Sequence, residues 1–360
     1  MMIIAAVGVA FCAFIFIRLV HRLYYLFMGH VHLAPSYSPR KALDHLLSEN
    51  RIAVGSHEIK TRDGVTLRYR RIGRGKRIFL LANGVGTDFF MWLPAIRGVL
   101  KARPVIFDEI TLLVPNYRGL FEPTDDKFET AEVSITVKEC VEDIETIMKH
   151  CQLVHIEGLI GWSTGAQVGL EFAAKCPDKV NKLFLFNPSC GETLHTALQP
   201  FFPLPQHVGN MISRRMTSFI VYLKTLIPQP LWNKLKKFND SVVFFSILSV
   251  FAFLGGFPPE QPSYFHEYMK DAFKTRSQTR ALLDLILSLD EPMSAACFKL
   301  EHSTTILSGV PDFLTGVYHS QRLEKTLRNS THIPFTMGSH FLLIEFPDDV
   351  SKELLHFLVN

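Results

Sequence analysis

Residues 153–175 join three patterns in a fixed order: an apolar run, the pentapeptide Gly161-Trp-Ser-Thr-Gly165 and a stretch with helical character. A Gly-x-Ser-x-Gly sequence between a buried strand and a helix is typical of a nucleophile elbow, a sharp turn that exposes the serine hydroxyl. Glycine is needed at positions 161 and 165 because neighbouring chains pass too close for a β-carbon. The pentapeptide alone is a weak signal in a chain with 21 glycines. Its place between a strand and a helix makes Ser163 the candidate nucleophile.

Short apolar runs alternate with amphipathic stretches along most of the chain. The expected strands are a hairpin at 58–61 and 65–71, followed by 77–82, 111–115, 153–160, 182–186, 304–307 and 333–336. This alternation predicts an α/β fold, with a mostly parallel sheet flanked by helices on both faces. From Asn187 to about Asp290 no strand pattern appears. That stretch predicts a helical cap, inserted after the strand that follows the nucleophile elbow.

Composition excludes several classes of function. The net charge is only +4 and the basic residues are scattered, so we expect no nucleic-acid partner. Neither a Cys-x-x-Cys pair nor metal-ligand spacing occurs among the six cysteines, Cys12, Cys140, Cys151, Cys176, Cys190 and Cys297. They are interpreted as ordinary buried or membrane thiols. No motif implies a metal ion or an organic cofactor.

The N-terminus differs from the rest of the chain, because residues 1–17 carry no charge and are mostly large and apolar. A run of this length is at the short end for a membrane span. A cleaved signal peptide and an interfacial helix are the alternatives. A signal peptide should start with basic residues and end in a small-residue cleavage site, and the sequence has neither. We therefore expect a retained, single-pass transmembrane helix within residues 1–28.

The sequence leaves open on which side of the membrane the remaining chain lies. Arg18, Arg22 and two further basic residues follow the apolar run, and the positive-inside tendency slightly favours a cytosolic catalytic domain. Two glycosylation-type triplets, starting at Asn239 and Asn329, would matter only in a lumen. Such triplets arise often by chance, so they barely change this expectation.

A serine nucleophile needs a base within hydrogen-bond reach, and the base needs a carboxylate to orient it. In a sheet of this kind the partners follow later strands, in the chain order Ser, Asp, His. Asp312 follows the strand at 304–307, and His340 follows the strand at 333–336. Ser163, Asp312 and His340 are therefore the expected catalytic triad. The competing carboxylates lie after the histidine or before the strand: Glu345, Asp348, Asp349, Asp290 and Glu291.

The oxyanion of a tetrahedral intermediate needs two hydrogen-bond donors. One expected donor is the backbone N–H of Thr164, at the N-terminus of the helix that follows Ser163, where the helix dipole helps. The other is expected at the N–H of Val85, in the glycine-rich turn Asn83-Gly84-Val85. A plain connecting turn is the alternative interpretation of this segment.

From about Ser56 to Asn360 the chain resembles the α/β-hydrolase superfamily. The matching pieces are Asp63-Gly64, Asn83-Gly84-Val85, Asn116-Tyr-Arg-Gly119, Gly161-Trp-Ser-Thr-Gly165, Gly309-x-x-Asp312 and Gly338-x-His340-Phe341. The resemblance implies nucleophile, acid and base roles for Ser163, Asp312 and His340. It also implies that the insertion acts as a lid. The family commonly has His where Asn83 stands and often Asp where Asn116 stands. Members with an Asp nucleophile are a poor match because of Ser163.

The sequence thus predicts five parts: a membrane anchor at 1–28, a linker and short helix at 29–55, a first core segment at 56–190, a helical cap at 191–292 and a second core segment at 293–360. The expected function is a membrane-anchored serine hydrolase that cleaves a carboxylic ester of a small-molecule or lipid-like acyl substrate. A cap rich in Phe, Leu, Met and Pro suits an acyl chain, although a cap also needs a core of its own. The alternatives are an acyltransferase with the same triad and a catalytically idle, membrane-bound interaction domain.

Overall fold

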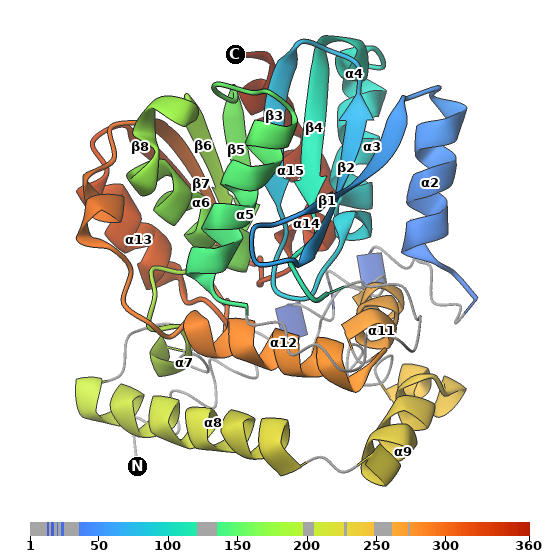
Figure 1. The fold of residues 1–360 in the computed structure, drawn as a ribbon, viewed down its shortest axis with the longest axis vertical. Coiled ribbons are helices and arrows are strands. Elements are labelled where there is room, and N and C mark those ends of the chain that lie inside the picture. The colour runs from blue at the N-terminus through green and yellow to red at the C-terminus, as the bar shows by residue number, and fades with distance from the viewer. Residues whose placement is uncertain are drawn as a thin grey trace.

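The computed structural model of the protein describes residues 36–120, 135–196, 205–226, 229–247, 261–272 and 274–360, together with residues 13, 16, 17, 20, 23 and 24. Within these residues an eight-stranded sheet has the order β1-β2-β4-β3-β5-β6-β7-β8 (Figure 1). The strands are β1 (Val54–Lys60), β2 (Thr66–Gly73), β3 (Arg77–Ala82), β4 (Ile110–Pro115), β5 (Gly158–Trp162), β6 (Lys182–Phe186), β7 (Ser303–Gly309) and β8 (Ser330–Phe335). The pairs β1/β2 and β2/β4 are antiparallel, and all other pairs are parallel. The predicted mostly parallel sheet is confirmed.

The central strands are buried on both faces, which explains their continuous apolar sequences. In β3, Phe79 and Leu81 belong to one apolar cluster, and Leu80 and Ala82 belong to the other. This division follows from the alternation of side chains along a strand. β3 and β6 have the bounds that the sequence predicts. β5 is shorter than predicted and starts at Gly158, because Ile156 forms only an isolated bridge to Val180.

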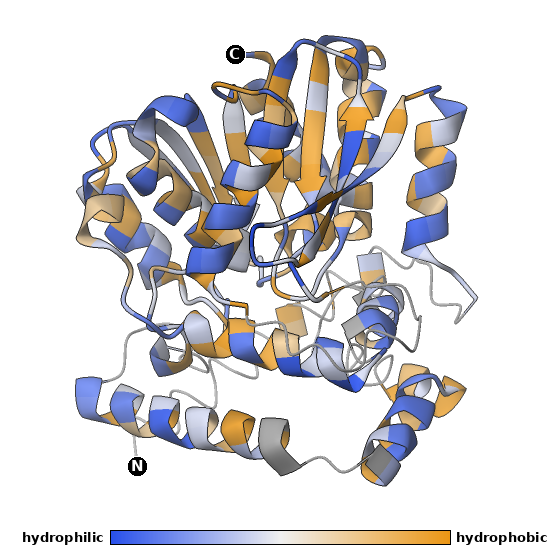
Figure 2. Ribbon diagram, in the orientation of Figure 1, coloured by the Kyte–Doolittle hydropathy of each residue, from blue (hydrophilic) through white to orange (hydrophobic). Residues whose placement is uncertain are grey.

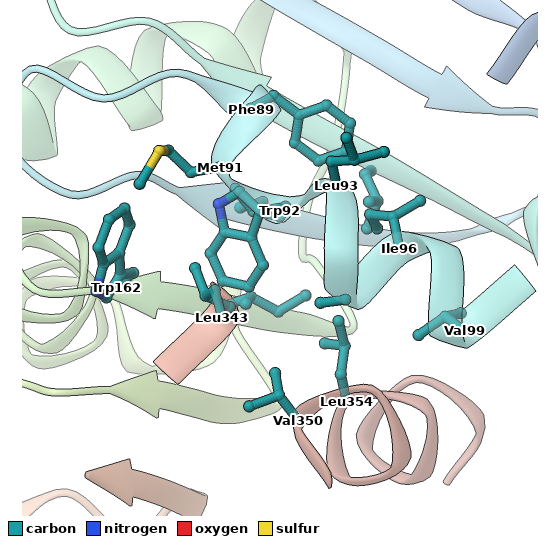
Figure 3. Packing of buried hydrophobic residues seen from close by; sticks show 14 of the residues in the cluster. Phe89, Met91, Trp92, Leu93, Ile96, Val99, Trp162, Leu343, Val350 and Leu354 are labelled. Carbon is teal, nitrogen blue, oxygen red and sulfur yellow. The ribbon is translucent and has the colours of Figure 1, made fainter. Parts of the chain in front are cut away.

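Helices cover both faces of the sheet. One face carries α2 (Pro39–Glu49), α3 (Leu93–Ala102), α14 (Leu342–Glu345) and α15 (Pro347–Val359), and the other carries α5 (Val137–His150), α6 (Thr164–Lys175) and α13 (Val317–Thr326). The remaining short helices of the core are η1 (Phe89–Trp92), α4 (Ile106–Glu109), η3 (Pro177–Lys179) and η4 (Ala295–Lys299). In the first cluster, Trp92 lies among Trp162, Leu343 and Leu354 (Figure 3). Trp162, the residue before the candidate nucleophile, is therefore part of the apolar core.

The described residues between β6 and β7 form helices joined by turns and contain no strand, as the sequence predicts. These helices are α7 (Thr193–Thr196), α8 (Gln206–Leu226), α9 (Gln229–Asn239), α11 (Gln261–Ala272) and α12 (Arg276–Ser288), and residues 242–247 are also helical. α11 and α12 lie next to one end of the sheet, and α8 and α9 lie beyond them (Figure 1). We call residues 191–292 the insert.

The predicted anchor at residues 1–28 lies for the most part outside the described residues. In the part of the chain that the structure describes, no helix combines the length and the apolar character needed to cross a bilayer. The anchor and the five predicted parts therefore stay predictions.

Candidate active site

The candidate site residues follow four parallel strands. The turn that contains Val85 follows β3, Ser163 follows β5, Asp312 follows β7 and His340 follows β8. Because parallel strands end at the same edge of a sheet, these segments meet at one edge. In open α/β sheets this is the edge at which ligands bind. The structure therefore gathers the segments that the sequence singled out.

Ser163 has the backbone conformation of a nucleophile elbow, with φ 55° and ψ −115°. A non-glycine residue at positive φ is strained, and such strain is common at active sites. The glycines on either side are required by close packing. A β-carbon on Gly165 would lie 2.0 Å from the carbonyl oxygen of Ala82, and one on Gly161 would lie 2.6 Å from that of Gly165. The local sequence thus makes a turn that few other sequences could adopt.

Asp312 and His340 form a hydrogen-bonded pair, in which His340 Nδ1 lies 2.8 Å from Asp312 Oδ2. Asp312 is completely buried and His340 is 7% exposed. The carboxylate also accepts the backbone N–H groups of Leu314 at 2.8 Å and Thr315 at 2.9 Å. These bonds fix the carboxylate, which fixes the imidazole ring through Nδ1. The other ring nitrogen, Nε2, is left for a proton transfer.

Trp162 connects the nucleophile elbow to the histidine loop. Its indole N–H donates to the backbone carbonyl oxygen of His340 at 3.1 Å, and the two rings lie 5.8 Å apart. Ser163, the next residue, is 7% exposed. Between Ser163 Oγ and the His340 ring, both in the described chain, no hydrogen bond is present. Such bonds are often long before substrate binds, so the arrangement remains compatible with proton transfer.

The predicted oxyanion donors lie in two segments that adjoin the elbow. Thr164 is the first residue of α6. The turn Gly84-Val85-Gly86 packs closely on Trp162, since a β-carbon added to Gly84 would lie only 3.1 Å from the indole ring. Within the described chain, neither the N–H of Val85 nor that of Thr164 donates to a protein group. Both donors are therefore available to a ligand, as an oxyanion hole requires. Their role stays a prediction.

Asn187 is a site residue that the sequence reasoning did not identify. It directly follows β6, has φ 41° and is 1% exposed. Its side-chain amide donates to the carbonyl oxygen of His340 at 2.9 Å, and its Oδ1 accepts the N–H of Gly309 at 2.8 Å. Its backbone carbonyl accepts the hydroxyl of Thr315 at 2.9 Å. The only sequence signal was a polar residue at the end of a fully apolar strand.

The competing carboxylates have other partners or positions. Glu345 is buried and accepts both the N–H and the hydroxyl of Ser339, so it fixes the loop that carries His340. Asp290 accepts the N–H groups of Leu194 and His195, at 2.8 and 3.1 Å, and thereby stabilises the start of α7. The other three competitors of Asp312, which are Glu291, Asp348 and Asp349, have exposed side chains. Among the described carboxylates, Asp312 is the one that contacts the His340 ring.

Helices of the insert contact the oxyanion turn. A β-carbon on Gly86 would lie 2.6 Å from Leu282 of α12 and 3.1 Å from the ring of Tyr268 of α11, and Gly86 has φ 62°. Burial raises the pKa of Tyr268 to about 12, so its hydroxyl stays protonated beside this turn. Phe265 of α11 also packs edge-on against Phe341, with ring centroids 4.6 Å apart. The insert therefore covers the edge of the sheet where the candidate residues lie.

Arg40 at the start of α2 joins the core to the insert. Its guanidinium pairs with Asp88 beside the oxyanion turn and with Glu267 and Asp271 of α11. Burial raises the pKa of both α11 carboxyl groups, and Arg40 opposes this effect. The segment that follows the predicted anchor is thus attached directly to the wall of the candidate site.

The described residues contain no cluster of three or more His, Cys, Asp or Glu side chains that could hold a metal ion. The five described cysteines are Cys140, Cys151, Cys176, Cys190 and Cys297, and all are free thiols. Burial raises the pKa of Cys190 to about 12, which makes it unreactive at neutral pH. The chemistry that the site can perform with its own residues is nucleophilic and acid–base catalysis.

The known proteins that are similar to this chain include several hydrolases. No family model matches the chain. The curated mouse (Mus musculus) protein Serine hydrolase BPHL is 29% identical over 127 residues, which are 34% of this chain and 40% of that protein. The match therefore spans less than half of the curated relative's length.

Solved structures match over most of the chain. An esterase from Exiguobacterium antarcticum has a TM-score of 0.59 at 13% identity, covering 84% of this chain and 99% of its own. MGS-M2, an alpha/beta hydrolase enzyme from a Medee basin deep-sea metagenome, has a TM-score of 0.58 at 17% identity, covering 84% and 98%. A membrane phospholipase A, described as a bacterial virulence factor, has a TM-score of 0.57 at 16% identity, covering 99% and 96%. At these identities the similarity shows a shared fold.

Proposed function

We propose that this chain, which has the α/β-hydrolase fold, is a membrane-anchored serine hydrolase that cleaves carboxylic esters of lipid-like acyl groups. One observation carries the proposal: the buried Asp312 carboxylate holds His340 Nδ1 at 2.8 Å, beside a serine in the strained conformation of a nucleophile elbow. The residues occur in the order that this fold requires, at the ends of β5, β7 and β8.

In the proposed reaction, Ser163 Oγ attacks the ester carbonyl carbon while His340 Nε2 takes the hydroxyl proton. Asp312 stabilises the imidazolium that forms. The N–H groups of Val85 and Thr164 donate to the oxyanion of the tetrahedral intermediate. The C–O bond to the alcohol then breaks, and His340 gives the proton to the leaving oxygen. A water molecule, deprotonated by His340, then attacks the carbonyl carbon of the acyl-enzyme. The bond between this carbon and Ser163 Oγ breaks, His340 returns the proton to Oγ, and the carboxylic acid is released.

The substrate class follows from the surroundings of the site. The insert brings apolar and aromatic side chains, among them Leu282, Tyr268 and Phe265, to the edge of the sheet where Ser163 lies. Pockets with such walls favour acyl chains over small polar esters. The uncharged run at residues 1–17 would hold the enzyme at a membrane, where lipid esters are concentrated. The names of the similar structures, an esterase and a membrane phospholipase A, agree with this class.

The proposal is tested by the hydrolysis of aryl esters of increasing acyl length, using detergent-solubilised protein and its Ser163→Ala variant. We expect turnover that depends on Ser163 and rises with acyl length. A preference for acetyl esters would contradict a lipid-like substrate. Equal rates for both proteins, together with no labelling of Ser163 by a fluorophosphonate, would contradict catalysis and leave an interaction domain. Ester products formed with an added alcohol would indicate an acyltransferase.

A further inference from the structure

The helix α9 turns an apolar stripe toward solvent. Leu231, Leu235 and Phe238 follow one another at the spacing of one helical face and are 46%, 40% and 45% exposed. An amphipathic helix of a soluble protein normally packs this stripe on the core. In α9 the inward side is formed by other residues, since Trp232 is 3% exposed and Asn239 is 8% exposed. The stripe is therefore not needed to attach α9 to the insert.

Further apolar side chains are exposed in the segment that follows α9. Val242 and Val243, in the next helical segment, are 65% and 61% exposed, whereas Phe245 of the same segment is buried and packs on His266 of α11. Two residues of α8 add to the exposed set, with Met211 57% and Phe219 60% exposed. We call the solvent-facing residues of these helices the outer face: Met211, Phe219, Leu231, Leu235, Phe238, Val242, Val243 and Ile247. Apolar patches of this kind on a protein surface usually mark interaction sites.

Basic side chains lie on the same helices as the outer face. In α9, Lys234, Lys236 and Lys237 are exposed, and the sequence of this helix contains no Asp or Glu. In α8, Arg214 and Arg215 are exposed, and that helix also contains no acidic residue. In the part of the chain that the structure describes, none of these five cations forms an ion pair. A helix that combines an apolar stripe with lysines is the pattern that binds an anionic lipid surface.

The position of the outer face in the molecule also suits a lipid surface. α8 and α9 lie at the end of the molecule beyond α11 and α12, and apolar and polar residues mix along both helices (Figures 1 and 2). α11 and α12 in turn contact the oxyanion turn through Tyr268 and Leu282. A surface that contacts α8 and α9 would therefore lie on the same side of the molecule as the candidate active site.

We propose that the outer face docks on a bilayer that contains anionic phospholipids, with the apolar stripe of α9 in the interface and its lysines at the headgroups. This inference rests on the proposed function, because it identifies the surface from which the lipid-like ester would be taken. The docked enzyme has the insert between the membrane and the sheet, so that an acyl chain reaches Ser163 through the insert without crossing water.

The test uses the full chain with Ser163→Ala, reconstituted into vesicles of phosphatidylcholine and phosphatidylserine at about two to one, with part of the phosphatidylcholine brominated on its acyl chains. A tryptophan is introduced by Leu235→Trp in the outer face. The matched control is Val154→Trp, because Val154 is 82% exposed and precedes β5, at the opposite edge of the sheet from Ser163. The three native tryptophans contribute equally to both proteins.

We expect the bromolipid to remove about half of the added emission in the Leu235→Trp protein and almost none in the Val154→Trp protein. Reversal of the three lysines of α9 to glutamate should lower this quenching to the control value. Substitution by glutamate of three exposed lysines outside the insert, Lys101, Lys325 and Lys352, should leave the quenching unchanged. Circular dichroism confirms that each variant is folded.

Equal quenching of both tryptophans, or quenching of neither, would overturn the proposal. Emission from the Leu235→Trp protein that is shielded from acrylamide but not quenched by bromolipid would also overturn it, and would indicate a protein partner or a second copy of this chain. The measurement needs no turnover. If the vesicles quench as expected but the protein that keeps Ser163 does not hydrolyse aryl esters, the docking surface stands and the proposed function fails.

Discussion

Asn187 donates its side-chain amide to the backbone carbonyl oxygen of His340, at 2.9 Å. The same side chain accepts the N–H of Gly309, at the end of the strand that leads to Asp312. Asn187 thus connects β6 to both loops that carry the partners of Ser163. It touches none of the reacting atoms, so we regard it as a positioning residue.

We expect Asn187→Asp to lower kcat for aryl esters by about 10- to 100-fold with little change in KM. The substitution removes the amide donor and places a carboxylate oxygen against the carbonyl of His340, and a disrupted buried hydrogen bond costs about 1–3 kcal/mol. Asparagine and aspartate both tolerate the positive φ of this position, so the fold is retained. A shift of the pH–rate profile would separate an effect on the imidazole from a general loss of stability. An unchanged kcat would contradict the positioning role.

The proposed acid role of Asp312 predicts a large effect from an isosteric change. Asp312→Asn keeps the volume but favours the wrong tautomer of His340, and in serine proteases the equivalent change lowers kcat by about 10⁴-fold. We expect a loss of about 10³- to 10⁴-fold in aryl ester hydrolysis. The matched control is Asp348→Asn, because Asp348 is an exposed carboxylate that also lies near His340 in the sequence. Similar losses in both variants would contradict the assignment of Asp312.

Gly86 should tolerate a side chain poorly for two separate reasons. Its φ of 62° disfavours any residue with a β-carbon, and that β-carbon would lie 2.6 Å from Leu282. Gly64 isolates the first cost, since it has φ 84° but no neighbouring atom within 4 Å of an added β-carbon. We expect Gly64→Ala to lower the free energy of unfolding by about 1 kcal/mol and Gly86→Ala by about 2–3 kcal/mol. Chemical denaturation measures both, and equal losses would mean that the insert does not press on this turn.

His319 predicts a pH dependence of stability. Burial lowers the pKa of His319 to about 4, and its ring accepts the N–H of Cys190 and contacts the hydroxyl of Thr196. The unfolded chain, with a histidine pKa near 6.5, therefore binds more protons than the folded chain between pH 4 and 6.5. The free energy of unfolding is therefore not reduced by His319 above pH 6.5. It decreases as the pH falls toward 4, by up to about 3 kcal/mol.

The measurement for His319 is urea denaturation between pH 4 and 7.5. His319→Gln should be less stable at neutral pH and should show a flatter pH dependence than the parent. His45→Gln is the control, because the side chain of His45 is 72% exposed. A parent and a His319→Gln variant with parallel pH curves would show that other groups cause the acid sensitivity.

The sequence predicts the strands well where both faces are buried. β3 and β6 are continuous apolar runs, and their predicted bounds agree with the structure. The start of β5 was predicted five residues too early, because Leu153, Val154 and Ile156 extend its apolar run but form no strand, and Ile156 makes only an isolated bridge to Val180. Val154 of this segment is 82% exposed, so an apolar residue next to a strand in the sequence need not belong to the buried strand.

Among the candidate site residues, chain order was enough to select Asp312 over Glu345. It could not identify Asn187, whose role depends on contacts with residues more than 100 positions away. Nor could it foresee the outer face. The helical spacing of Leu231, Leu235 and Phe238 predicts one apolar side of a helix, but only tertiary structure decides whether that side faces the core. Local pattern determines the element, and long-range packing determines its orientation.

The insert leaves and rejoins the sheet at two neighbouring strands. Phe186 pairs with Leu307, the N–H of Asn187 donates to the carbonyl of Leu307 at 2.8 Å, and Gly191 packs against the backbone around Pro292. Its two stems therefore emerge side by side, and no pairing between the described strands involves the described residues of the insert. Lineages of this chain could lengthen, shorten or replace the insert and keep the strand ends in register. Grafting a different insert between the two stems should therefore leave the proposed triad residues in place, because they follow strands of the sheet.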